Sequence, residues 1–404
     1  MTRVNILRPR NARVWFSWPV VALVSWALAS GVVDGVLVLI LLRHHLPLAL
    51  LGILMGLAMG SSLVGYRITT HVTPLQWSYI LPWAFMITGI ARLSWVGLAG
   101  WVQLVPVVIS AMCSSVVHIG LDLQWTRQHA RTEYQRLFAQ KSQLQAWSRL
   151  VGGIVGAWLW FGGSNDPLVA SGLLALGLGG LGFVRGRALE GPPFASRTVQ
   201  GATPTVTHFY RDRRWRLIFV SSMLFIPVAT AMAAYWPVIL HQDQINLRWI
   251  PWFYPAMLLM SGMTSRVVGM RRWPSSHRGF FVIGWTAVAL GILLLTVRAS
   301  VIAPIYGVAV AWMFYTAGLG LIGPARHTWV NHLVTDDARS VVLSRLAFWE
   351  TLAALLTLVG TSPFLHIKLG TWFLPGATIV LLGWLLFLFV ATVLPKTTDH
   401  QISS

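Results

Sequence analysis

The chain has 404 residues, of which 56% are hydrophobic and only 10% are charged, and its mean hydropathy is +0.67. Soluble domains carry about 25% charged residues, so this composition excludes an ordinary soluble domain and indicates an integral membrane protein. The formal net charge of +19 could suggest a nucleic-acid partner, but the placement of the basic residues argues against one.

Apolar stretches long enough to cross the hydrocarbon core of a bilayer, roughly 18–25 residues, recur along the whole chain. We predict twelve spans, at 16–42, 46–66, 75–98, 101–124, 143–162, 167–184, 217–240, 252–268, 280–298, 302–323, 343–364 and 372–394.

The Lys and Arg residues are distributed unevenly between the two sides of the predicted membrane. When the segments between spans are assigned to alternate sides, 25 of the Lys and Arg residues fall on one side and 5 on the other. The positive-inside rule then predicts an even number of spans and places both termini in the cytoplasm. We therefore expect a multi-pass protein of the cell membrane, whose basic charge reflects topology, and no nucleic-acid partner.

The longest polar interruption divides the spans into two sets of six. Its Gly, Pro, Ser and Thr content is that of a linker. We predict an amino-terminal bundle at 1–185, a cytoplasmic linker at 186–216 and a carboxy-terminal bundle at 217–404.

The fifth and eleventh spans begin alike. Four residues of the first, Ser142, Leu144, Trp147 and Leu150, recur 202 positions later as Ser344, Leu346, Trp349 and Leu352. Two six-span repeats around a midplane site are typical of secondary transporters. We therefore predict an all-α membrane protein with twelve transmembrane helices in two six-helix pseudo-repeats around a central cavity.

Two segments resemble motifs of the major facilitator superfamily. The first runs Gly323-Pro324-Ala325-Arg326, then Asn331, then Asp336-Asp337-Ala338-Arg339, and is similar to that family's tenth-helix exit and following loop. The second, Gly262-x-x-x-Arg266-x-x-Gly269-x-Arg271-Arg272, resembles the family's Gly-x-x-x-Asp-Arg-x-Gly-Arg-Arg loop, with Arg266 in place of the acid.

The resemblance covers essentially the whole chain and implies a secondary transporter in which the first helix of each half lines the cavity. The glycines Gly152, Gly153 and Gly156 match part of the family's antiporter signature, but its Gly-Pro pair is missing. The surroundings of Asp34 look most like those in the drug- and siderophore-exporter branches.

Three acids, Asp34, Asp122 and Glu350, lie inside predicted spans. A carboxylate there is costly and marks a candidate functional site. Asp34 has no basic residue within a turn or two in sequence, and it stands alone in apolar surroundings. A desolvated carboxyl group without a nearby cation holds its proton more readily, so we predict that Asp34 is the proton-coupling site. The alternative is a structural carboxylate bonded to backbone or paired with Arg92.

The fourth span carries a polar stripe with a spacing of four residues, which places its members on one helix face. It consists of Ser110, Ser114, His118 and Asp122. His118 and Asp122 could relay protons, and we count both among the proton-coupling and substrate candidates. The favoured alternative for Asp122 is an ion pair with Arg149. With one distant cysteine, Cys113, the stripe does not make a metal site, and we expect neither metal nor cofactor.

Glu350 lies one turn into the eleventh predicted span, where basic residues are expected at its depth. We predict that it forms a gating or structural ion-pair network with Arg326 and Arg345. Arg149 is predicted to take part in a corresponding ion pair in the first half. Direct coupling by Glu350 is the alternative.

Aromatic residues on the seventh and tenth spans are predicted to line the cavity and to suit an amphipathic or aromatic substrate, with lipid-facing packing as the alternative. They are Tyr235, Trp236, Trp312 and Tyr315.

The function predicted from these features is secondary active transport of a small organic solute by alternating access, with proton-coupled export as the favoured direction. We expect a monomer in the lipid bilayer. The chain has no Gly-x-x-x-x-Gly-Lys-Ser/Thr phosphate loop and no hydrolase signature such as His-Glu-x-x-His or Gly-x-Ser-x-Gly, so we do not expect an enzyme. A lipid or lysolipid flippase, a polytopic membrane enzyme and a non-transporting sensor are the remaining alternatives.

Overall fold

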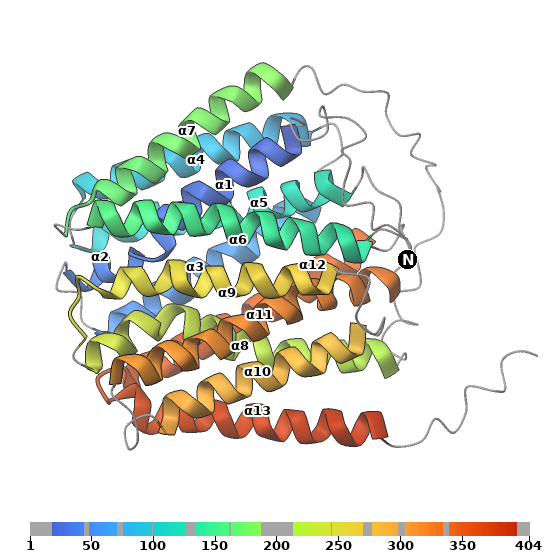
Figure 1. The fold of residues 1–404 in the computed structure, drawn as a ribbon. Helices are drawn as coiled ribbons and strands as arrows, with labels where there is room; N and C mark the ends of the chain where they lie inside the picture. Colours follow the sequence, from blue (N-terminus) through green and yellow to red (C-terminus); the bar gives the residue numbers. More distant parts are fainter. Residues whose placement is uncertain are drawn as a thin grey trace, which may run out of the picture.

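A computed structural model gives the arrangement of the helices (Figure 1). The structure describes residues 18–43, 48–70, 76–98, 100–126, 134–160, 163–186, 213–243, 245–269, 277–297, 304–333 and 339–393. Every regular element in these ranges is a helix, which confirms the predicted all-α class. Helices are expected because the bilayer core offers the backbone no hydrogen-bond partner of its own.

The elements of the first half are α1 (Trp18–Asp34), α2 (Leu37–Arg43), α3 (Leu48–Thr70), α4 (Trp77–Gly97), the short 3₁₀ helix η2 (Gly100–Gln103), α5 (Leu104–Thr126), α6 (Tyr134–Leu159) and α7 (Asp166–Gly186). Those of the second half are α8 (Arg213–Gln242), α9 (Ile250–Gly269), α10 (His277–Val297), α11 (Pro304–Leu333), α12 (Arg339–Thr361), the 3₁₀ helix η8 (Ser362–Phe364) and α13 (Leu369–Val393). Because α1 and α2 together form one broken span, the α-helices correspond one to one to the twelve predicted spans.

Several helices extend beyond the apolar stretches that predicted them. α6 begins at Tyr134 rather than at 143, and α11 continues to Leu333 rather than ending at 323. Apolar content marks only the part of a helix that lies in hydrocarbon, whereas polar end turns continue the same helix into the interface. As a consequence, Arg149 lies near the middle of α6 and not at its cytoplasmic end.

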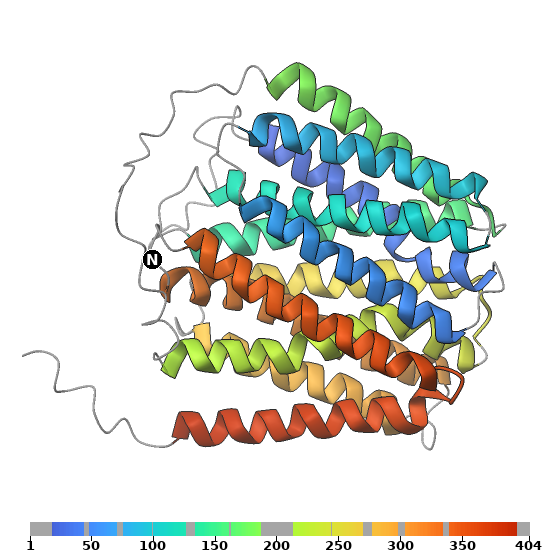
Figure 2. The ribbon, with the colours of Figure 1, turned by 180° about the vertical axis from the view of Figure 1, so that it is seen from behind.

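The packing within one half recurs in the other, with the helix order shifted by six spans. In the first half α4 packs against α5 and α7, and α3 against α5; in the second half α10 packs against α11 and α13, and α9 against α11. Figures 1 and 2 show the two bundles side by side, with the start of α1 and the end of α13 at the same end of the molecule. The predicted linker falls largely in 187–212, outside the described residues.

The most extensive contacts between the halves are made by two helix pairs: α6 packs against α9 on one side (Figure 1), and α3 against α12 on the other (Figure 2). Within the described residues, eight helical segments are long and apolar enough to cross a membrane by themselves, but α6 and α9 are not among them. These two helices can be less apolar because they are covered by each other rather than by lipid alone. The seam between the halves is thus the place where polar groups can be accommodated.

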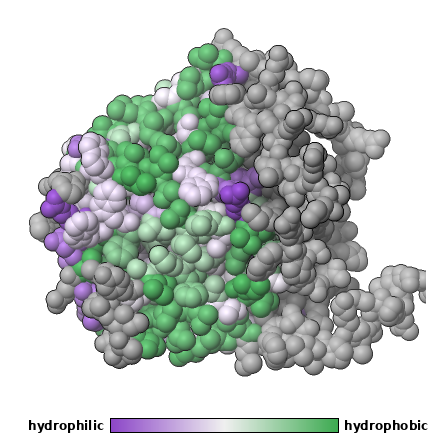
Figure 3. All heavy atoms as spheres, viewed as in Figure 1, coloured by the Kyte–Doolittle hydropathy of each residue, from purple (hydrophilic) through white to green (hydrophobic). Residues whose placement is uncertain are grey.

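The outer face of the molecule is suited to lipid. In Figure 3 hydrophobic residues cover most of the helical surface, and hydrophilic residues gather mainly at one end. Large apolar side chains such as Trp158 and Ile379 are strongly exposed, at 68% and 71%. Exposed apolar area of this kind is rare on soluble monomers and marks a membrane-facing surface.

One apolar cluster joins the halves at the end where α2 lies. It contains the buried run Val38–Leu41 of α2 and, from α8, Met232, Trp236 and Ile239. The clusters nearer the opposite end stay within a half: one is built from α1, α4 and α5 together with residues of α6 and α7, and two are built from second-half helices. The bundle is therefore closed by apolar packing at the predicted extracellular end.

Close packing of α1 on α6 depends on glycine. A β-carbon at Gly156 would collide with the backbone oxygen of Val32, and one at Gly152 with that of Leu28. We expect Gly156→Ala to lower stability by roughly 1–3 kcal/mol, because two backbones must separate to admit the methyl group. The measurement is the melting temperature of the purified protein in detergent.

The matched control is Gly180→Ala on α7, where a β-carbon would meet nothing within 4 Å. Alanine is the better helix former by about 1 kcal/mol, so this variant should melt at the same or a slightly higher temperature. Equal melting temperatures for the two variants would contradict the proposed packing.

Candidate functional site

Asp34 lies at the break in the first span. α1 ends at Asp34, a two-residue turn follows, and α2 begins at Leu37. The Asp34 side chain is 38% exposed although it lies between helices. Broken spans of this kind are where membrane transporters place ion and substrate sites, because irregular backbone is tolerated only beside protein or a water-filled cavity.

Arg149, in the middle of α6, faces this carboxylate. Its Nε atom lies 4.0 Å from Oδ2 of Asp34, a distance that permits electrostatic attraction but not a hydrogen bond. The Nε atom is buried and has no hydrogen-bond partner among the described residues, while the side chain as a whole is 31% exposed. The pair is possible because Gly31 of α1 lies directly against the backbone of Arg149.

Tyr254 of α9 reaches the same carboxylate from the second half. Its hydroxyl donates a hydrogen bond of 3.1 Å to Oδ2 of Asp34. Its ring fits between two glycines, because a β-carbon at Gly35 would lie 2.9 Å from the ring and one at Gly153 would lie 3.0 Å away. The Tyr254 contact therefore crosses the seam between the halves.

The sequence around Asp34 offers no partner, and the folded chain supplies partners from other helices. These partners come from α6 and α9, which are adjacent to α1 or to its break only in the folded chain. Arg92, the alternative partner, instead donates hydrogen bonds to the backbone oxygen of Ala29, at 3.3 Å, and to the hydroxyl of Ser171. Helix packing, and not proximity in sequence, determines the environment of Asp34.

The polar stripe of α5 is only partly described. His118 lies edge-on to Trp26, with ring centres 6.1 Å apart. The side chain of Asp122 falls outside the described residues, so its pairing with Arg149 or with His118 stays a prediction. The ion pair described for Arg149 is with Asp34.

The second half contains a more enclosed pair. Glu350 of α12 forms an ion pair with Arg326 of α11, and their side chains are only 12% and 14% exposed. Arg326 also donates from Nε to the hydroxyl of Ser222 on α8, at 3.0 Å. Arg345 is exposed on the same helix as Glu350, so the described ion pair links Glu350 to Arg326 and, through Ser222, joins three helices.

The four predicted cavity aromatics form packed contacts instead of an open lining. Trp312 lies edge-on to both Trp236 and Tyr315, and Trp236 is parallel to Tyr254 at 6.5 Å. The hydroxyl of Tyr235 bonds to Thr361 at 2.7 Å. All four are at most 3% exposed, and Trp236 is the one of them that contacts Tyr254 among the described ring pairs.

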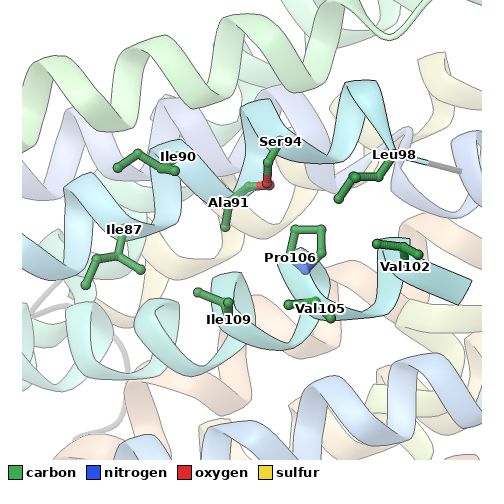
Figure 4. Close-up of a pocket in the computed structure, with 9 residues that line it drawn as sticks. All are labelled: Ile87, Ile90, Ala91, Ser94, Leu98, Val102, Val105, Pro106 and Ile109. Carbon is green, nitrogen blue, oxygen red and sulfur yellow. The ribbon is translucent and has the colours of Figure 1, made fainter.

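A groove between α4 and α5 lies apart from these charges (Figure 4). Its volume is about 410 Å³. It is lined by Ile87, Ile90, Ala91, Ser94, Leu98, Val102, Val105, Pro106 and Ile109. Its one polar side chain, Ser94, bonds to the backbone of its own helix. Such a lining suits lipid chains and not a polar solute.

Sequence reasoning missed Tyr254. Tyr254 belongs to the aromatic run Trp252–Tyr254 at the start of a span, where aromatic residues normally anchor helices at the interface. The sequence feature that could have identified it is a polar hydroxyl group one turn inside an otherwise apolar span. Which face it occupies depends on the contact between α6 and α9.

Comparisons with known proteins find similarity in structure alone. No protein-family model matches the sequence, and no curated protein has a significant sequence match. The xylose transporter XylE from E. coli, in a partially occluded inward-open conformation, superposes with a TM-score of 0.69 at 14% identity, covering 96% of this chain and 99% of that one.

The nucleoside transporter NupG superposes with a TM-score of 0.66 at 10% identity, over 93% of this chain and 96% of that chain. The human organic anion transporter MFSD10 gives 0.65 at 11% identity, over 92% and 98%. XylE is a major facilitator superfamily protein. The chain therefore has the twelve-helix, two-half fold of that superfamily.

The enclosed pair in the second half gives a direct stability test. We expect Arg326→Gln and Glu350→Gln each to cost about 3–5 kcal/mol, because each leaves an uncompensated charge between helices. The double variant should lose less than the sum of the two, since no lone charge remains. Melting temperatures of the three variants in detergent measure this.

Lys368 provides the control, because it lies 4.0 Å from Asp243 but is 57% exposed. Lys368→Gln should change stability by at most about 1 kcal/mol. Additive losses in the Arg326/Glu350 double variant would show that the two residues do not form a coupled pair.

Proposed function

We propose that the chain is a secondary active transporter that moves a small organic solute by alternating access, with Asp34 as its proton site. The supporting observation is the contact of Asp34 with Arg149 from its own half and with Tyr254 from the opposite half. An ionisable group inside the membrane that touches the moving interface can convert a change of charge into a change of conformation.

The geometry suggests how protonation would act. Both described contacts are made to Oδ2 of Asp34, and none is described for Oδ1. A hydrogen bond to a carboxylate is stronger than one to a neutral carboxyl group. Proton uptake therefore weakens the Tyr254 contact and removes the attraction to Arg149, which loosens the seam on the side of α6 and α9.

The distribution of buried apolar clusters supports a state in which the predicted extracellular end is the more firmly closed of the two. The cluster that joins the halves lies at the predicted extracellular end, whereas the clusters nearer the other end stay within a half. Rocking of one bundle against the other about a central site is the motion of two-repeat transporters. Asp34 would then exchange protons with the cytoplasm in this state.

The fold also guides the choice of solutes for testing. The neighbours are named as transporters of xylose, nucleosides and organic anions, so one solute of each kind should be tried. Export against an inward proton flow is the direction that the sequence favours. Loaded vesicles and external-uptake vesicles, each with an imposed pH gradient, separate export from import.

Asp34→Asn tests the proton site while keeping the volume of the side chain and its ability to accept from Tyr254. We expect solute movement driven by the pH gradient to fall roughly tenfold or more, equivalent to at least about 1.4 kcal/mol, while the melting temperature changes little. The measurement is gradient-driven flux of xylose, uridine and benzoate in proteoliposomes.

The control is Asp166→Asn, because Asp166 is an exposed acid at the start of α7 whose carboxylate accepts a hydrogen bond from the hydroxyl of Ser164. That variant should transport normally. If Asp34→Asn also keeps full gradient-driven flux, or if no solute moves under any gradient, the proposal fails.

Tyr254→Phe tests the link between the halves. The phenyl ring still fits between Gly35 and Gly153, but the hydrogen bond to Asp34 is lost. We expect gradient-driven accumulation to fall several-fold while exchange of solute at equal concentrations continues. Parallel accumulation and exchange assays measure this, and an equal loss in both would show that Tyr254 is only a packing residue.

A further inference from the structure

The two halves differ in how their buried charges are balanced. In the second half, Arg326 and Glu350 neutralise each other in an enclosed pair. In the first half, the carboxylate of Asp34 is accompanied by Arg149 and by the buried Arg92, and neither arginine makes an enclosed pair of that kind. The charges around Asp34 are therefore less completely balanced than those of the Arg326–Glu350 pair.

Arg92 contributes a fixed positive charge. It is 7% exposed, and its hydrogen bonds go to the neutral oxygens of Ala29 and Ser171. Its guanidinium lies 5.3 Å from the ring centre of Trp26, and it interacts electrostatically with Asp34. A guanidinium cannot lose its proton under ordinary conditions, so this charge persists in every state of the site.

Arg149 has donors that the fold leaves unused. Its distance of 4.0 Å from Asp34 is too long for a hydrogen bond, and its buried Nε has no partner among the described residues. A guanidinium carries five N–H donors arranged to grip a carboxylate or phosphate with two parallel bonds. The partial exposure of Arg149 and the adjoining ring of Tyr254 give such an anion both a charged and an aromatic surface.

We propose that the solute bound at this site is an organic anion, held through its carboxylate or phosphate by the Arg149 guanidinium. Asp34 competes with the anion for the same guanidinium, and the buried charge of Arg92 favours the anion over a neutral solute. This inference rests on the proposed function, because it names the substrate class of the same site.

The competition has a defined consequence. While Asp34 is ionised, it partly satisfies Arg149 and repels an incoming anion. When its charge is removed, the site has the Arg149 guanidinium and no described carboxylate of its own, while the buried charge of Arg92 is unchanged. Binding of the anion and loss of the Asp34 charge therefore favour each other, and by linkage each promotes the other by the same factor. An anion bound in this way would move in the same direction as the proton, in contrast to the export by exchange that the sequence favours, and the two vesicle orientations distinguish these directions.

The test uses the full-length protein in detergent with three probes of similar shape: benzoate, phenyl phosphate and neutral benzamide. Ionic strength is held constant with sodium chloride. Binding to the folded state raises stability according to ligand concentration over the dissociation constant, so melting temperatures give relative affinities. We expect stabilisation by one or both anions and none by benzamide, and the comparison of benzoate with phenyl phosphate identifies the preferred group.

Three variants make the test specific. Arg149→Gln should abolish the stabilisation by anions, and Asp34→Asn should tighten anion binding about tenfold because the competitor is neutralised, the equivalent of about 1.4 kcal/mol. Arg185→Gln, at an exposed arginine in the last turn of α7, should leave anion binding unchanged. If Arg149→Gln fails to fold, Arg149→Lys replaces it, with weakened binding expected because the paired donors are lost.

The inference is overturned if benzamide stabilises the protein as well as the anions do, if neither anion stabilises it, or if Asp34→Asn weakens anion binding. It fails separately from the proposed function. Asp34-dependent flux of xylose or uridine without anion binding would retain the transporter and reject the anion. Arg149-dependent anion binding without flux under any gradient would retain the anion site and reject the transporter.

Discussion

The hydrogen bond from Tyr254 to Asp34 is the interaction on which the proposed mechanism depends. It joins the two halves at a point where the first span is broken and a carboxylate is partly exposed. Its strength depends on the charge of Asp34, whereas the apolar contacts elsewhere along the seam do not respond to charge. One protonatable group can therefore bias the arrangement of two large bundles without any change in their internal packing.

The contact between Tyr254 and Asp34 is possible only because the positions around it are glycines, which have no side chain to block it. Glycines on α1 and α6 bring the two backbones together, and Gly35 and Gly153 leave room for the ring of Tyr254. In a bilayer, helix association relies on close packing and on hydrogen bonds between helices, since lipid tails are as apolar as the helices themselves. The glycines thus place Arg149 beside Asp34 and allow a tyrosine from the other half to reach both.

The hydropathy pattern was sufficient to predict the twelve spans, because each must satisfy its own backbone in hydrocarbon. It also drew attention to Asp34, since an acid among apolar residues is conspicuous. The hydropathy pattern could not identify the partners of Asp34. The apolar stretch at 143–162 puts Arg149 close to its first residue, whereas α6 begins at Tyr134 and brings Arg149 near the middle of the helix. Tyr254 could not be placed because the face that α9 presents to α6 is a property of packing and leaves no periodic signal.

The pseudo-repeat explains why the two halves can serve different roles. Glu350 occupies the position that corresponds to Ser148, beside Arg149, in the repeated start of the fifth and eleventh spans. The second half thus carries an acid where the first half has a hydroxyl, and that acid is neutralised locally by Arg326. A neutral, enclosed pair holds its helices together at constant charge. The first half retains a partly exposed carboxylate and an Arg149 Nε that has no hydrogen-bond partner among the described residues, which is why the proposed proton and anion sites both lie on its side of the seam.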